Sequence, residues 1–213
     1  MANTAYSTLF QEVQGYVVGV PQPTILSAMR LAAVEFCRRS EAYKYRPATI
    51  TVTAGLSSYS PTLPSETEIH GYAQVLYNSG KLTFLDWDTV TDQDPAFPSI
   101  AGTPGNFTYQ AVSTLYLVPV PSVAPDVGLQ LSLVLRPTVS ANGVDADLMA
   151  RYREAFVHGT VRRLCLMGNK TWSDPAKAKL HGALFNGVVT DAHSEAKSNF
   201  GATADRVQIR KFR

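Results

Sequence analysis

Charged residues are scarce in this chain. Asp, Glu, Lys and Arg make up 17% of its 213 residues, whereas about a quarter is typical of soluble domains. Apolar residues reach 45%, and 14 glycines with 13 prolines are an ordinary share, so neither a disordered nor a collagen-like chain is expected. A surface this poor in charge is either coated with Ser, Thr, Asn and Gln or partly covered in an assembly.

Cysteines and long apolar runs are also few. The two cysteines, Cys37 and Cys165, each lie within an apolar helical pattern, and neither belongs to a C-x-x-C pair. We expect two buried thiols in a reducing compartment. No apolar run approaches the roughly 18 residues of a membrane span, and the opening MANTAYSTLF has no secretory-signal pattern. Neither a membrane segment nor a leader is therefore expected.

The few charges are unevenly distributed. Residues 48–140 hold two basic and seven acidic side chains, a net charge of −5, which leaves +7 for the rest of the chain. The overall charge of +2 does not by itself indicate binding to nucleic acid or to an anionic membrane. The segment charges predict a polarised subunit.

Proline placement predicts the domain organisation. Ten of the thirteen prolines fall between Pro47 and Pro137, where they would break helices. The middle is therefore predicted to be β and the flanks helical. We predict an α+β fold, an antiparallel bundle of about four helices with an inserted small antiparallel β-sandwich or barrel-like domain. The expected parts are residues 1–47 and 141–203 for the bundle, 48–140 for the β domain and 204–213 for a C-terminal docking tail.

Two helices are predicted in the first flank. A short one covers Tyr6 to about Gln14, and a longer one follows Pro21 and Pro23, since proline suits a first helical turn. The longer helix has helical spacing of apolar residues. These residues are Ile25, Leu26, Met29, Ala32, Ala33, Phe36 and Cys37.

The last third predicts a helical hairpin. Asp145 or Asp147 would cap its first helix, which Gly168 and Asn169 would end in a left-handed conformation. Asp174 and Pro175 are typical of the start of the second helix, and Gly201 would end it. The expected apolar face of the second helix consists of Leu180, Ala183, Leu184, Gly187, Val188 and Ala192.

Short strands with turn residues between them are predicted in the middle region. Asn78, Ser79 and Gly80 predict a tight hairpin turn. Alternating leucines from Leu129 to Leu135 predict a half-buried strand. The expected strands cover residues 49–53, 73–77, 81–85, 106–111, 114–118 and 129–135.

Templates for catalytic and binding sites do not fit. The segment from Gly168 to Thr171 lacks the glycine that a phosphate loop places directly before its lysine. The run DWDTVTDQD lacks the glycine and the final glutamate of a calcium loop, so Asp86, Asp88, Asp92 and Asp94 are expected in a solvated acidic loop. None of the four histidines has partners at metal-ligand spacing. We expect no catalytic residue, no cofactor and no metal.

The final segment, RVQIRKFR, is the one feature with a binding pattern. Its apolar residues alternate with basic ones, so it could add a strand to the sheet edge of another chain while its arginines pair with acidic or phosphate groups. A solvated basic tail is the alternative interpretation. The candidate docking residues are Arg206, Val207, Ile209, Arg210 and Phe212.

Taken in order, several segments resemble the head-to-tail adaptor proteins of tailed bacteriophages, in particular the tubular tail protein A type of short-tailed phages. The resemblance covers nearly the whole chain. It rests on ILSAMRLAAVEFCRRSEAY (25–43), GTPGNFTYQAVSTLYLVPVP (102–121), LVLRPT (133–138), AFVHGTVRRLCLMGNKTWSDPAKAK (155–179) and the closing RVQIRKFR.

The resemblance implies a structural virion component with no enzymatic activity. Such a protein would form a twelve-subunit ring between the portal protein and the tail nozzle, and the genomic DNA would pass through its channel without sequence-specific binding. The tail would dock on the portal or a neighbouring subunit. The acidic loop at residues 86–94 would face the nozzle and, in some cases, tail fibres. Assembly would take place in the host cytoplasm, away from any membrane.

Two alternatives stay open. One is a tail-associated glycan hydrolase that uses the acids of residues 86–94 as a carboxylate pair. The other is a nucleic-acid-binding protein that uses Arg162, Arg163 and the basic tail.

Overall fold

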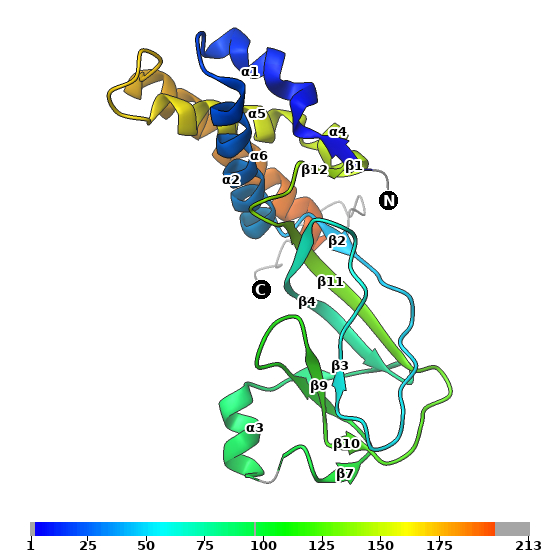
Figure 1. The fold of residues 1–213 in the computed structure, drawn as a ribbon. Helices are drawn as coiled ribbons and strands as arrows, with labels where there is room; N and C mark the ends of the chain where they lie inside the picture. The colour runs from blue at the N-terminus through cyan, green and yellow to red at the C-terminus, as the bar shows by residue number, and fades with distance from the viewer. Residues whose placement is uncertain (1–2, 96, 199–213) are drawn as a thin grey trace, which may run out of the picture. The chain divides into compact units, whose positions relative to one another are not determined.

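The computed structural model describes residues 3–95 and 97–198. The chain is mixed α and β and forms two units, each of which is described separately (Figure 1). The helical unit comprises residues 7–42 and 147–198, and the β unit comprises residues 3–6 and 43–146. Each unit is thus built from two separate stretches of the chain.

Three long helices make up most of the helical unit. They are α2 (Gln22–Ser40), α5 (Arg153–Cys165) and α6 (Pro175–Lys197), and they pack against one another, with α1 (Phe10–Tyr16) against α2 and α5. The 3₁₀ helix η1 (Tyr6–Leu9) and α4 (Ala146–Arg151) lie at the chain junctions between the units. Inside the helical unit, the ring of Phe36 on α2 lies 5.1 Å from that of Tyr152 and 5.4 Å from that of Phe156.

The helix starts follow the predicted capping chemistry. The Asp174 side chain accepts a hydrogen bond of 2.9 Å from the backbone N–H of Lys177, and Pro175 occupies the first turn of α6. Proline likewise occupies the first turn of α2. The predictions for both starts are confirmed, because a cap needs only local sequence.

The predicted helix from residue 145 or 147 to Gly168 is interrupted, and this prediction is wrong at two points. α4 ends at Arg151, and Tyr152 leaves the helical conformation with φ −118° and ψ 30°. α5 ends at Cys165, whose carbonyl accepts the Asp174 backbone N–H at 3.0 Å. A residue of the loop that leads into α6 thus donates a hydrogen bond to the last carbonyl of α5. Asn169 is left-handed as predicted, with φ 58°, but it lies in the turn beyond the helix.

The face of α6 that packs in the core differs from the predicted one. Leu180 and Leu184 remain 59% and 44% exposed, and Ala183 and Gly187 are also exposed. Among the predicted residues, Ala192 is buried. The buried residues of α6 are Ala178, His181, Phe185, Val189, Ala192 and Ala196. The sequence of α6 is apolar on two faces, so periodicity could not decide which of them the core would take.

The β unit contains two four-stranded sheets. One has the order β2 (Lys44–Tyr45), β11 (Leu129–Pro137), β4 (Thr67–Tyr77) and β5 (Gly80–Lys81). The other has the order β3 (Ser58–Tyr59), β9 (Leu115–Val118), β8 (Asn106–Thr108) and β6 (Thr83–Phe84). Two further pairs join β10 (Val120–Pro121) with β7 (Ala101–Gly102), and β1 (Asn3–Ala5) with β12 (Gly143–Asp145). The remaining element of the unit is the short helix α3 (Trp87–Gln93).

Most predicted pairings occur. Asn78 and Ser79, with φ 48° and 66°, form the tight turn between β4 and β5, the left-handed pair that a two-residue hairpin needs. β8 and β9 pair antiparallel as predicted. In β11, all four alternating leucines from Leu129 to Leu135 are buried. These predictions are confirmed.

Two β predictions are corrected. Residues 49–53 do not form a strand, since Ile50 makes only an isolated bridge to Leu129. The β unit is also not wholly antiparallel, because β6 pairs parallel with β8, and β10 with β7. After the turn at Asn78, the chain stays in the first sheet for only two residues and then joins the second. Long-range pairing of this kind leaves no local signal.

Aromatic side chains connect the two sheets. The ring of Tyr72 on β4 lies 5.9 Å from that of Phe107 on β8 and 5.5 Å from that of Tyr109, on which it stacks. The Tyr72 hydroxyl donates to the Val112 carbonyl at 2.8 Å. Phe84 on β6 contacts both Phe107 and Tyr109. Aromatic pairs of this geometry are each worth about 1 kcal/mol beyond the area they bury.

Candidate functional site

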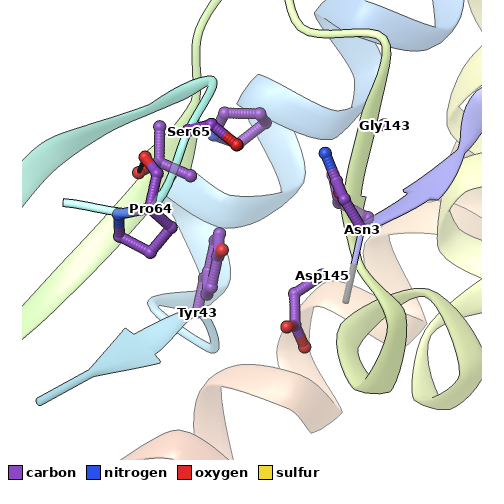
Figure 2. A pocket seen from close by; sticks show the side chains of 9 residues that line it. Asn3, Tyr43, Pro64, Ser65, Gly143 and Asp145 are labelled. Carbon is purple, nitrogen blue, oxygen red and sulfur yellow. Dashed lines mark hydrogen bonds between the residues drawn. The ribbon is translucent and has the colours of Figure 1, made fainter. Parts of the chain in front are cut away.

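Two hollows of the described residues differ from a typical small-molecule site, one in size and the other in its lining. In the β unit, Asn3 and Asp145 line one side of a pocket, Pro64 and Ser65 the other, and Tyr43 lies between them (Figure 2). The cavity measures about 20 Å³, which is room for about one water molecule. A small-molecule site usually offers about 300 Å³ or more, mostly apolar and enclosed.

The helical unit has a larger hollow at its surface, of about 290 Å³ and lined mostly by polar groups. Tyr16 and Trp172 form part of its lining, together with Lys177, whose Nζ donates to the Tyr16 carbonyl at 2.9 Å. In residues 3–95 and 97–198, no group of three or more His, Cys, Asp and Glu is placed to hold a metal. No helix of that same described part is long and apolar enough to cross a membrane.

The strongest charge cluster lies in the helical unit and centres on one carboxylate. Glu35 on α2 accepts hydrogen bonds of 2.6 Å from Arg162 and Arg163 on α5, and one of 3.2 Å from Arg39, one helical turn away. The Glu35 side chain is only 15% exposed. Arg39 also donates to the Asn186 side chain on α6 at 2.9 Å. The Glu35 carboxylate thus joins α2 to α5, and Arg39 extends the cluster to α6.

Burial and the arginines act on Glu35 in opposite directions. Burial, the largest influence, raises the pKa of its carboxyl, but the charges and hydrogen bonds of Arg162, Arg163 and Arg39 outweigh it and lower the pKa overall. The guanidinium of Arg162 also lies 5.1 Å from the centre of the Phe185 ring, a cation–π contact. Glu35 therefore stays ionised at neutral pH and holds three cations in place.

This cluster changes the role expected for two arginines. Under the nucleic-acid alternative, Arg162 and Arg163 would reach phosphates, but both pair with Glu35 in the structure. Their partner lies more than 120 residues away along the chain, a separation at which sequence spacing gives no sign of pairing. These arginines serve the interior contacts of the helical unit.

A pair of histidines forms a second cluster that sequence spacing did not predict. His158 on α5 and His181 on α6 place their Nδ1 atoms 3.0 Å apart, and the Tyr16 ring packs edge-on against both. Because one nitrogen must accept the hydrogen bond, both rings cannot be protonated in this arrangement. In an antiparallel helical hairpin, residues at equal distances from the turn lie opposite each other. His158 and His181 are about equally far from the turn between α5 and α6, so this rule could have predicted the pair.

Because of the histidine pair, the free energy of unfolding of the helical unit is expected to be lower at acidic pH. Burial is the main cause that lowers the pKa of both rings. At His158 the negative charges of Glu154 and Glu12 oppose this shift, whereas at His181 the charges of His158 and Lys177 lower the pKa further. A lowered folded pKa means that stability is full above the unfolded value of about 6.5 and falls as the pH drops toward the folded value. The free energy of unfolding is therefore expected to fall as the pH is lowered from about 7.5 to 5.

Urea unfolding followed by circular dichroism across this pH range measures the loss. The variant His158→Asn should flatten the dependence near pH 6, because one of the two coupled rings is gone. The control variant His70→Gln, on β4 in the β unit, should keep the wild-type dependence. An equally steep dependence in His158→Asn would contradict the assignment.

In the β unit, the Glu66 side chain forms hydrogen bonds with both strand β1 and Asn142. Glu66 itself is left-handed, with φ 59°. Its carboxylate accepts hydrogen bonds of 3.2 Å from the side chain of Asn3 on β1 and from both the backbone and the side chain of Asn142. Strand β1 thus pairs with β12 through its backbone and binds Glu66 through the Asn3 side chain.

The predicted acidic loop is partly a helix, which corrects that prediction. Asp86 is the N-cap of α3, and its side chain accepts from the Asp88 backbone N–H at 3.3 Å. Asp88 lies in the first turn of α3, where a negative charge is favourable, and Asp92 lies near the helix end, followed by Asp94 as the C-cap. The four carboxylates thus flank or belong to one short helix.

The residues predicted for tail docking, Arg206, Val207, Ile209, Arg210 and Phe212, lie outside the described residues.

Comparison with known proteins gives one finding. A family model described as SU10 adaptor protein matches residues 4–208, which include nearly the whole of both units. No curated protein matches the chain.

Proposed function

The chain belongs to the SU10 adaptor protein family and is a phage head-to-tail adaptor, a structural component of the virion, and from this we propose that it forms a ring that joins the portal protein to the tail nozzle. Twelve copies would surround a channel through which the genomic DNA passes. The observation that carries the proposal is the family match across both units. A match to one unit alone would leave the role of the other open.

The composition and surface of the chain support assembly. Only 17% of its residues are charged, and large apolar side chains remain exposed on α2 and α6. Large exposed apolar patches mark surfaces that meet another protein. A ring needs two such surfaces on each subunit, one for each neighbour, because a heterologous contact that closes generates a ring.

We further propose a division of roles along the chain. Residues 1–47 and 141–203 form the ring wall, residues 48–140 face the nozzle and the fibres, and residues 204–213 dock on the portal or on a neighbour. The acids of the α3 region, Asp86, Asp88, Asp92 and Asp94, would lie on the nozzle side. The opposite net charges of the two parts, −5 and +7, suit partners of different surface charge.

Electron microscopy of the purified chain mixed with the portal protein of its phage tests the proposal. We expect rings bound to the portal. A chain that ends at residue 205 should fold like the full chain but bind the portal more weakly, since it lacks the docking residues. Failure of the full chain to bind either the portal or the nozzle protein would refute the ring-adaptor role.

A further inference from the structure

The helical unit presents two apolar surfaces that its own core does not use. The α2 outer face consists of Ser27, Leu31, Val34 and Arg38, with Leu31 45% exposed and Val34 half-buried. The α6 outer face consists of Leu180, Leu184, Gly187 and Asp191, with the two leucines 59% and 44% exposed. On each helix these residues lie on the side away from the buried residues, so the two faces of one chain do not meet.

The two faces match in spacing and in chemistry. Each has successive intervals of four, three and four residues, the 4-3 alternation by which helices pack along a seam. Aligned in parallel, Leu31 lies opposite Leu184, and Val34 lies opposite Gly187, which has no side chain to clash with it. Arg38 then lies opposite Asp191, so a cation meets a carboxylate at one end of the seam.

The direction of the helices favours a parallel seam. α2 runs antiparallel to α5, since Phe36 contacts Tyr152 and Phe156 while Ala32 lies beside Gly159. α6 also runs antiparallel to α5, since His158 contacts His181 and Tyr152 contacts Glu195. α2 and α6 are therefore parallel to each other within one chain. Rotation about a ring axis preserves the axial direction, so helices that run along the axis remain parallel between neighbouring copies.

We propose that the α6 outer face of one copy of this chain docks on the α2 outer face of the next copy. This inference rests on the proposed ring and names the surfaces that form it. The contact is heterologous, because the two faces differ, and repetition of it around an axis closes a ring. The Arg38–Asp191 pair sets the register of the seam, and the leucines supply the apolar burial.

Cysteine cross-linking tests the partnership of the two faces directly. Full-length chain carrying both Leu31→Cys and Leu184→Cys, oxidised with diamide during assembly with the portal protein, should give a ladder of disulfide-linked oligomers. Each single variant should give none, since its cysteine faces a leucine. Cross-linked dimers of the single Leu184→Cys variant would reveal a two-fold α6 contact and overturn the proposal. The wild-type chain should also give no ladder, because Cys37 and Cys165 are buried and burial raises the pKa of both thiols.

Charge reversal tests the register. Arg38→Asp and Asp191→Arg alone should each weaken oligomer formation about tenfold, as measured by sedimentation, because like charges would then face each other. The double variant should recover most of the wild-type assembly. Lys179→Glu, an equal charge reversal at an exposed residue about a third of a turn from Asp191 around α6, should assemble normally. Absence of recovery in the double variant would refute this pairing.

Gly187→Phe separates folding from docking. A Cβ atom at Gly187 would meet nothing within 4 Å in the isolated subunit, and the position is exposed, so the variant should fold as stably as the wild type, yet it should not form rings. If both the wild type and Gly187→Phe form rings, the proposed seam is wrong but the proposed adaptor ring stands. A wild-type chain that forms no oligomer, either alone or with the portal protein, would overturn both.

Discussion

Replacing Gly159 with valine is expected to lower the free energy of unfolding of the helical unit by about 3 kcal/mol. Gly159 lies on α5 where the three long helices meet. A Cβ atom there would come within 2.9 Å of the Phe185 ring and 3.0 Å of the Ala32 side chain. Both neighbours are fully buried, so neither has room to move away. The gain in helix propensity on replacing glycine, below about 1 kcal/mol, offsets only part of this cost.

Urea unfolding monitored by far-ultraviolet circular dichroism measures the change. Gly187→Ala is the matched control, since it also removes a helical glycine, but at a position where a Cβ meets nothing within 4 Å. At concentrations where the chain is monomeric, it should raise stability by up to about 1 kcal/mol. Equal effects of the two substitutions would show that packing around Gly159 is looser than the structure has it.

Replacing Glu35 with alanine should cost about 2 to 3 kcal/mol. The substitution leaves Arg39, Arg162 and Arg163 close together without their shared carboxylate. Glu35 is 15% exposed and its main partner Arg162 is 21% exposed, so water screens the remaining cations poorly. Removal of one partner from such a group costs more than the pair itself contributes, because unpaired charge stays behind.

The matched control is Glu12→Ala, which breaks an ion pair with Arg153 in the same unit. Both partners of that pair are more exposed, at 36% and 51%, and its loss should cost no more than about 1 kcal/mol. Acid titration gives a second readout for Glu35. Its lowered pKa means that its contribution is present above about pH 4.5 and is lost as the pH falls through the folded value. A loss in Glu35→Ala as small as that in Glu12→Ala would contradict the central role of this carboxylate.

Local chemistry made some elements predictable from the residues alone. The cap at Asp174, the turn at Asn78 and Ser79, and the alternating leucines of β11 each depend on neighbours within a few positions. The α3 helix was missed because its acidic residues favoured a loop, although Asp86 is itself a good N-cap residue. The resemblance to phage adaptors rested on the order and spacing of several segments rather than on any single motif.

Contacts between distant segments could not be predicted in the same way. Glu35 receives two arginines from α5, and His158 meets His181, because α2, α5 and α6 pack in one particular register. The consecutive strands β5 and β6 belong to different sheets, and this too depends on long-range pairing. None of these contacts has a sequence spacing that distinguishes it from many alternatives.

The sequence by itself determined the α+β character, the helix starts, the hairpin turns and the resemblance to phage adaptors, since these follow from local propensity and from the order of motifs. Only the tertiary structure decided which face of α6 is buried. Leu180, Leu184 and Phe185 are all apolar, and packing around α5 selected the face that carries Phe185. As a result, Leu180 and Leu184 of the α6 outer face remain exposed on the helical unit.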